Sequence, residues 1–490
     1  VEHLDGKVSG RSARGGIFTM LAYVYEFGTR TAAMLILARI LAPSEIGLVA
    51  IVMLVSSFFM MFADVGLTAA TIQAPQLSQA QASNLFWING LLGLGLAALA
   101  CLAAPLVSWF FGEKEVVPML CLSALGFVAC GLSFQHRALL QRQMRFERFG
   151  LINVIALTLG LGAAIFLAKA GWGAYSLVLQ NLIIYVAGLV LAWAACNWRP
   201  GLPDRTCSVR PMVRFGGAVF GSNILNFLAR QLDKLIVGRR WGAVEHGLSQ
   251  YGFRISTLPG SMAFEPLGKV AVPALSRLRE KPEESARYYL RMVEVVCVLT
   301  VPFAWLLFAY PAEVVYLALG DNWKDCVPLV RAFSGLVLVN PLLGTTLWLF
   351  ISRGQGKRML QWLSISCSSF LVCLGIGALF DIESFVWIYS ATIIGLAIPC
   401  LMFAIHGTRI RLAAIAKIFS RACLGGMVAA ALTYFLARPP LVDSGIGRVM
   451  VAMLLIGGFS LVYMLFMCAI FRSHRIVFAL LKKLRTPEAV

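Results

Sequence analysis

The chain has 490 residues, of which 59% are hydrophobic and 13% are charged. A soluble protein of this length has no interior large enough for so much apolar surface, so the composition excludes a soluble globular protein and indicates a polytopic membrane protein. The formal net charge of +19 does not indicate a nucleic-acid partner, because the basic residues stand singly or in small groups between apolar runs.

Apolar runs of about 20 residues, the length that crosses a bilayer as a helix, recur along the whole chain. They predict an all-α membrane protein with about fourteen transmembrane helices. The expected spans are 15–38, 46–70, 86–111, 117–135, 150–169, 174–196, 214–238, 248–271, 289–310, 327–351, 359–380, 384–406, 418–437 and 448–471. With the N-terminus in the cytoplasm, the cytoplasmic segments hold 25 of the 42 Lys and Arg residues and the opposite segments hold eight. This asymmetry predicts that both termini are cytoplasmic.

The first and seventh expected helices carry an internal repeat with an offset of 200 residues. Residues 16–48 (GIFTMLAYVYEFGTRTAAMLILARILAPSEIGL) align without a gap with residues 216–248 (GGAVFGSNILNFLARQLDKLIVGRRWGAVEHGL), and nine of the 33 columns are identical. Chance gives about two or three. The identical columns include Phe27/Phe227, Arg30/Arg230, Arg39/Arg239, Glu45/Glu245 and Gly47/Gly247.

This offset makes the repeating unit six helices long. Six is an even number, so both copies enter the membrane from the same side and are parallel repeats. We predict two six-helix lobes, residues 1–197 and 198–410, followed by helices 13 and 14 in residues 411–472 and a cytoplasmic tail in residues 473–490.

Several charged residues lie within these apolar helices, where a charge is costly and commonly marks a transport pathway or a binding site. Glu26 and Arg30 stand four residues apart in helix 1, so we expect them to form an ion pair. Helix 7 carries Arg230, Asp233 and Lys234, in which one carboxylate stands beside two cations. Helix 7 therefore keeps surplus positive charge, whereas Arg30 is largely neutralised by Glu26.

Helices 1 and 7 and their neighbours are expected to line a positively charged cleft that suits an anion, since arginine matches phosphate oxygens in a two-bond fork. The predicted substrate-binding residues are Arg30, Arg230, Lys234 and Arg254, and the predicted coupling or gating residues are Glu26, Asp64 and Asp233. We expect the second copy to bind the anion and the first to gate or couple. Interhelical ion pairs or snorkelling ends are the simpler explanation for Lys269, Arg291, Glu294 and Arg331.

The sequence offers little for catalysis or for a metal. It has no HExxH, GxSxG or P-loop motif, and its 12 cysteines form no CxxC pair. We expect neither an enzyme nor a metal site, and no cofactor beyond a coupling H⁺ or Na⁺.

Four stretches resemble the polysaccharide-transporter (Wzx-like) branch of the multidrug/oligosaccharidyl-lipid/polysaccharide flippase superfamily. They are LARILAPSEIGLVAIV (37–52), FADVGLTAATIQAPQLSQAQASNLFWIN (62–89), LLQRQMRFERFGLINV (139–154) and RFGGAVFGSNILNFLARQLDKLIVGRRWG (214–242). The resemblance implies a V-shaped, MATE-like fold of two six-helix lobes plus two helices. It also implies alternating access that carries undecaprenyl-diphosphate-linked oligosaccharide across the bacterial inner membrane, for exopolysaccharide, capsule or O-antigen synthesis.

The partners implied by this resemblance are the lipid-linked oligosaccharide, membrane lipids, and a polymerase with other polysaccharide-assembly proteins. Two functions of the same superfamily remain as alternatives, a lipid II-type flippase and a cation-coupled multidrug exporter. An exporter of organic cations would require net acidic charge at membrane depth, and the predicted cleft is net basic.

Overall fold

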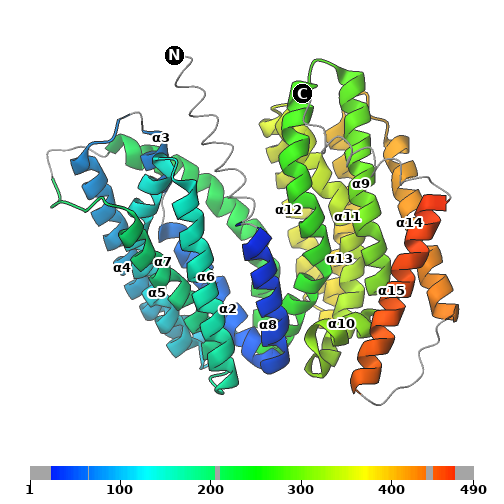
Figure 1. The fold of residues 1–490 in the computed structure, drawn as a ribbon, viewed down its shortest axis with the longest axis horizontal. Helices are drawn as coiled ribbons and strands as arrows, with labels where there is room; N and C mark the ends of the chain where they lie inside the picture. Colours follow the sequence, from blue (N-terminus) through cyan, green and yellow to red (C-terminus); the bar gives the residue numbers. More distant parts are fainter. Residues whose placement is uncertain are drawn as a thin grey trace. The chain divides into compact units, whose positions relative to one another are not determined.

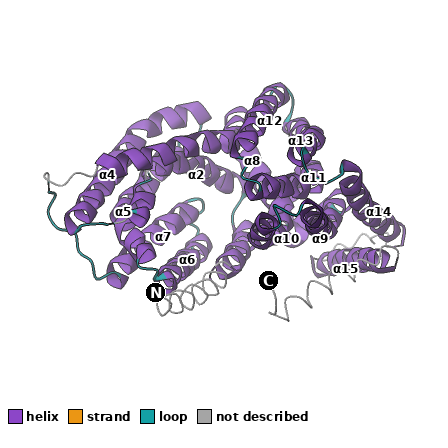
Figure 2. Ribbon diagram, turned by 90° about the horizontal axis from the view of Figure 1, so that it is seen from above, coloured by secondary structure: helices purple, strands orange, loops and turns teal. Residues whose placement is uncertain are grey.

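The computed structural model describes residue 22 and residues 24–63, 66–74, 76–204, 210–436 and 445–469. Side chains are left out at 210–230, 263, 265, 436, 445–448 and 469. Every regular element in these ranges is a helix (Figures 1 and 2). The chain divides into two compact units, Val1–Gly247 and Leu248–Val490. The division into lobes at residue 197 and the boundaries of the C-terminal helices and tail stay predictions.

Unit 1 begins with a helix over residues 24–40 and ends within the long helix α8. Its further elements are α2 (Pro43–Ala63), α3 (Leu67–Gln73), α4 (Gln79–Phe111), α5 (Val116–Arg142), α6 (Phe146–Lys169), α7 (Tyr175–Ala195) and the first part of α8 (Arg210–Arg277). Unit 2 contains the rest of α8, α9 (Pro282–Ala309), α10 (Pro311–Leu319), η1 (Asp321–Cys326), α11 (Val327–Ser352), α12 (Gly356–Gly377), α13 (Ile382–Ile405), α14 (Leu412–Leu436) and α15 (Gly445–Ala469).

Eleven of the described helices are long and apolar enough to cross a membrane, which confirms the predicted all-α polytopic class. Each of the eleven corresponds to one expected span. Of the other three expected spans, 15–38 begins outside the described residues, and 214–238 and 248–271 both lie in α8. The total of fourteen stays a prediction.

The second expected span, 46–70, is wrong at its C-terminal end. α2 ends at Ala63, and the short helix α3 begins after Gly66, whose φ of 70° is left-handed. A left-handed residue cannot continue an α-helix, so Gly66 separates α3 from any helix before it. The link between the expected spans 289–310 and 327–351 is also not a plain loop, because it contains the short helices α10 and η1.

The two units use the same helix packing. α5 packs against α4 and α7, and α6 packs against α7; in unit 2, α11 packs against α9 and α13, and α12 packs against α13 (Figure 1). Arg148, in the first turn of α6, donates to the carbonyl of Ala195 at 3.0 Å. Arg358, in the first turn of α12, donates to the carbonyl of Phe403 at 2.9 Å. Both arginines satisfy unpaired carbonyls in the last turn of the neighbouring helix.

Glycines allow α4 and α5 to approach closely. A Cβ on Gly131 would lie 2.5 Å from the carbonyl oxygen of Asn89, and one on Gly93 would lie 2.6 Å from that of Phe127. Small residues are the usual means of close helix packing in lipid, where hydrophobic burial does not drive association.

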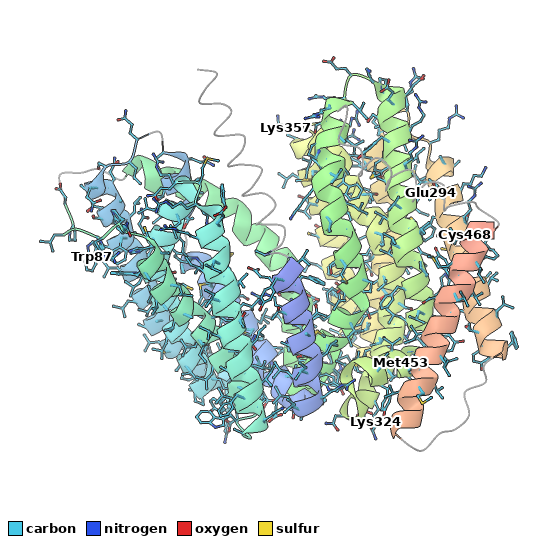
Figure 3. All side chains as sticks on the ribbon, in the orientation of Figure 1. Trp87, Glu294, Lys324, Lys357, Met453 and Cys468 are labelled. Carbon is cyan, nitrogen blue, oxygen red and sulfur yellow. The ribbon has the colours of Figure 1, made fainter. Side chains whose placement is uncertain are left out.

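The segment that follows α7 is fastened to the first turns of α4. Trp87, labelled in Figure 3, donates its indole N–H to the carbonyl of Gly201 at 2.9 Å. The side-chain amide of Asn84 donates to the carbonyl of Asp204 at 2.7 Å, and its oxygen accepts from the amide of Asp204 at 2.9 Å. Residues up to 204 are thereby held to α4 in unit 1.

Both copies of the repeat consist of a helix, a break and a second helix. In the first copy the break falls at Leu41 and Ala42, and Glu45 accepts from the amide of Ala42 at 2.8 Å. A glutamate in the third helical position commonly caps the residue before its helix in this way. In the second copy Gly242 interrupts α8 with φ 81° and ψ −173°, and Glu245 occupies the column of Glu45. The identical glutamates therefore mark equivalent helix starts.

Candidate functional site

Arg30 and Glu26 lie on the helix over residues 24–40, but they do not pair as expected. Arg30 is exposed and Glu26 is half-buried, and the structure forms no salt bridge between these two described side chains. Glu26 instead acts electrostatically on Arg137 of α5, and Arg30 acts on Tyr185 of α7. The i, i+4 spacing suggested the pair, but spacing along one helix does not fix the side-chain conformations that a salt bridge requires.

Arg137 is a half-buried cation that the sequence reasoning missed. It was expected in the link between the spans 117–135 and 150–169, yet α5 continues to Arg142 and makes Arg137 part of a helix of unit 1. Its guanidinium donates to the Oδ1 of Asn153 and stands 5.3 Å from the ring centre of Phe149. Gly188 lies beside it: a Cβ there would be 3.6 Å from the guanidinium, an ordinary contact. The four arginines of residues 137–148 looked alike in the sequence, but α5 contains the first two and ends before the others.

The second copy places its charges on α8. Asp233 and Lys234 are half-buried, and Lys234 acts electrostatically on Asp233, so this part of the predicted cluster is together. Lys234 also acts on His246, which is 0% exposed. The side chain of Arg230 lies outside the described residues.

Two further residues, Asp64 and Arg254, belong to the predicted set. Asp64 lies outside the described residues, and Arg254 is an exposed residue of unit 2. In the part of the chain that the structure describes, no three His, Cys, Asp or Glu side chains lie close enough to hold a metal ion. The cleft between the lobes stays a prediction.

Arg30 and Arg137 are the described guanidinium groups of unit 1 that are candidates for the predicted anion-binding surface. Arg30 is an exposed guanidinium without a carboxylate partner on its own helix, and Arg137 adds a second cation whose position is set by Asn153 and Phe149. Charges held in apolar helices act strongly because little water screens them. Such a surface attracts a phosphate group, which has the oxygens to accept from a guanidinium fork.

A family model described as "Polysaccharide biosynthesis protein" matches residues 36–328, more than half of the chain. The chain belongs to this family. Its helices are therefore those of a multi-pass membrane protein of the polysaccharide biosynthesis family, which confirms the resemblance seen in the sequence.

Two curated relatives of this family member are named for polysaccharide synthesis. It is 24% identical over 327 residues to the lipopolysaccharide biosynthesis protein WzxC of Escherichia coli, a match that covers 66% of each chain, just under two thirds. It is 24% identical over 388 residues to the succinoglycan biosynthesis transport protein ExoT of Rhizobium meliloti, covering 77% of this chain and 78% of ExoT.

Among solved structures, this family member is similar to the lipid II flippase MurJ in an inward closed conformation. The TM-score is 0.71, with 13% sequence identity, over 94% of this chain and 99% of that chain. At this identity the similarity establishes a common fold.

Proposed function

We propose that this protein is a flippase that moves an undecaprenyl-diphosphate-linked oligosaccharide from the cytoplasmic to the outer leaflet of the bacterial inner membrane. Membership of the polysaccharide biosynthesis family carries the proposal. The fold shared with a lipid II flippase supports it, as does the name of ExoT, a transport protein for succinoglycan synthesis.

In this mechanism the diphosphate binds to Arg30, Arg230, Lys234 and Arg254 while the lipid chain stays in the bilayer. Arg30 is exposed and forms no salt bridge with Glu26, which supports its place in this set. We therefore propose that both copies of the repeat bind the anion, and not the second copy alone. Each guanidinium–phosphate fork forms two charge-assisted hydrogen bonds, which are stronger than neutral ones.

Alternating access then exposes the headgroup to the outer side. The membrane potential contributes about 2.3 kcal/mol per elementary charge per 100 mV, and an inside-negative potential drives an anion outward. Glu26, Asp64 and Asp233 are the residues through which H⁺ or Na⁺ would couple to this movement.

The test is complementation of a deletion strain that lacks other polysaccharide flippases. Arg30→Ala, at normal protein level, is expected to lower polymer export by about 10-fold or more, because a hydrogen bond to a charged group contributes about 1.5–3 kcal/mol. The lipid-linked oligosaccharide accumulates in the membrane, and Arg30→Lys retains part of the export since it keeps the charge without the fork.

Lys357→Ala is the matched control, because it removes an exposed positive charge of α12 that belongs to none of the predicted sites. Full export by both Arg30→Ala and Arg230→Ala would contradict the proposed binding residues. Export of organic cations with no effect on polymer would favour a multidrug exporter instead.

A further inference from the structure

The two copies of the repeat contact each other through the same glycine. A Cβ on Gly47 would lie 1.6 Å from the carbonyl oxygen of Ala243, and a Cβ on Gly247 would lie 2.2 Å from the carbonyl oxygen of Pro43. Gly47 and Gly247 share a column of the repeat, and so do Pro43 and Ala243. Each copy therefore places its glycine against the start of the other copy's second helix, in a reciprocal contact of the kind a two-fold axis produces. We call these four residues of unit 1 the glycine joint.

The surroundings of the joint come from the adjoining ends of α4 and α5. The amide of Ala243 donates to Glu113, which follows α4, at 3.4 Å. Ala243 also packs in an apolar cluster with residues of α2, α4 and α5, among them Phe111. The joint is thus a close backbone contact set in an apolar environment. Two packed segments of this kind have discrete joined and separated arrangements, because packed surfaces do not deform continuously.

The two copies differ at one buried position beside these glycines. The residue before Gly47 is Ile46, and the residue before Gly247 is His246; they are 3% and 0% exposed. Neither ring nitrogen of His246 has a hydrogen-bond partner among the residues described. Its ring lies beside Gly238, where a Cβ would be 3.6 Å from the Nδ1 of His246 and 2.9 Å from the ring of Phe111. A buried polar group without a partner destabilises a protein, and the first copy shows that an apolar residue fits this column.

We propose that the glycine joint opens and closes during transport, and that His246 is the residue at which a proton opens it. The inference rests on the proposed function only in assigning this movement to a transport cycle. The reciprocal glycine contact and the buried His246 beside it, from which the proposal is argued, are features of unit 1 itself.

The pKa of His246 in the closed and in the open joint determines how pH shifts the equilibrium between the two forms. His246 lies between the expected spans 214–238 and 248–271, and burial lowers its pKa to about 4, with a further contribution from the charge of Lys234. Two carboxylates at the joint accept from backbone amides, Glu113 from that of Ala243 and Glu45 from that of Ala42, and Glu245, next to His246 in the chain, has an interaction of its own. In an open joint the imidazole regains water, and its pKa returns to about 6.5.

The open form therefore binds a proton more tightly, and acid favours it. The closed joint keeps its full stability above about pH 6.5. It loses this stability as the pH falls toward about 4, the pKa of His246 in the closed joint. Lowering the pH from about 8 to about 5 is expected to shift the equilibrium toward the open form by about 30-fold.

The test measures access to the joint in the purified full-length protein, held in lipid nanodiscs so that reagents reach both faces. Ala243, 5% exposed, is replaced by cysteine, and its modification by a maleimide is quantified by peptide mass spectrometry. Val244→Cys places a thiol at an exposed neighbouring position. Its modification rate at each pH gives the intrinsic reactivity of a thiol, and the rate for Ala243→Cys is divided by it. The corrected rate is expected to rise by about 30-fold between about pH 8 and about pH 5.

Two variants remove the titrating group. His246→Ile installs the residue of the first copy, and His246→Gln keeps a polar side chain that does not titrate. In both, the corrected rate is expected to be independent of pH. A flat profile in the parent protein, or an unchanged pH dependence in either variant, would overturn the proposal. Neither result depends on which substrate is transported, so the proposed function stands or falls separately in the complementation test.

Discussion

Replacing Gly47 by alanine tests the steric basis of the glycine joint at a pH where His246 is neutral. The added Cβ would lie 1.6 Å from the carbonyl oxygen of Ala243, where ordinary contact begins at 3.4 Å. The two backbones must therefore separate by about 2 Å, because neither atom belongs to a flexible side chain.

The magnitude follows from two opposing terms. Forcing a methyl group into a packed contact costs about 1–3 kcal/mol. Exchanging glycine for alanine in a helix recovers about 0.5–1 kcal/mol. The net effect of about 1–2 kcal/mol corresponds to a 5- to 30-fold shift toward the open joint, measured as the corrected labelling rate of Ala243→Cys at about pH 8.

Gly95→Ala in α4 is the matched control, since a Cβ there has no atom within 4 Å. It is expected to leave the labelling rate unchanged and to stabilise its helix slightly. Gly247→Ala should behave like Gly47→Ala, because its Cβ also meets a backbone oxygen, at 2.2 Å. Equal labelling rates for Gly47→Ala and Gly95→Ala would refute the steric argument.

Two further predictions concern side chains that form hydrogen bonds with backbone groups at helix ends. Arg358→Ala removes the hydrogen bond to the carbonyl of Phe403 and the contact of the guanidinium with its ring at 4.7 Å. It is expected to lower the free energy of unfolding by about 1–3 kcal/mol in denaturant titrations in detergent; a loss just as large for Lys357→Ala would assign the effect to charge alone. Glu45→Ala removes the acceptor of the Ala42 amide and is expected to cost about 0.5–2 kcal/mol, with a lower thermal midpoint. Glu45→Gln can still accept from this amide, so equal midpoints for the two variants would exclude the cap.

The charged residues show where reasoning from the sequence succeeds and where it stops. The i, i+4 spacing placed Glu26 and Arg30 on one helix face, but spacing says nothing of Arg137, which reaches Glu26 from α5. The basic run that contains Arg137 indicated a link, because four arginines in twelve residues are typical of cytoplasmic segments. Lys234 stands beside Asp233 because the two are consecutive in the chain, and their role as a site stays a prediction.

The repeat illustrates the same limit. Alignment alone identified Glu45, Gly47 and their counterparts as identical columns, without a reason for their identity. The glutamates stand at helix starts, where the reason is local: Glu45 accepts from the amide of the residue before its own helix. The glycines are explained only by a carbonyl oxygen of the other copy, 200 residues away in the chain.

By itself, the sequence determined that this protein is an all-helical, multi-pass membrane protein with an internal repeat, and it pointed to the family. Those properties depend on hydropathy, on the length of the apolar runs and on periodicity, and each of these can be read from consecutive residues of the chain. The tertiary structure decided that Glu26 and Arg30 form no salt bridge, that Arg137 is half-buried on α5, and that His246 is buried beside two glycines in backbone contact. Each of these depends on distances between helices that are far apart in sequence, because side-chain contacts form only after the helices have packed.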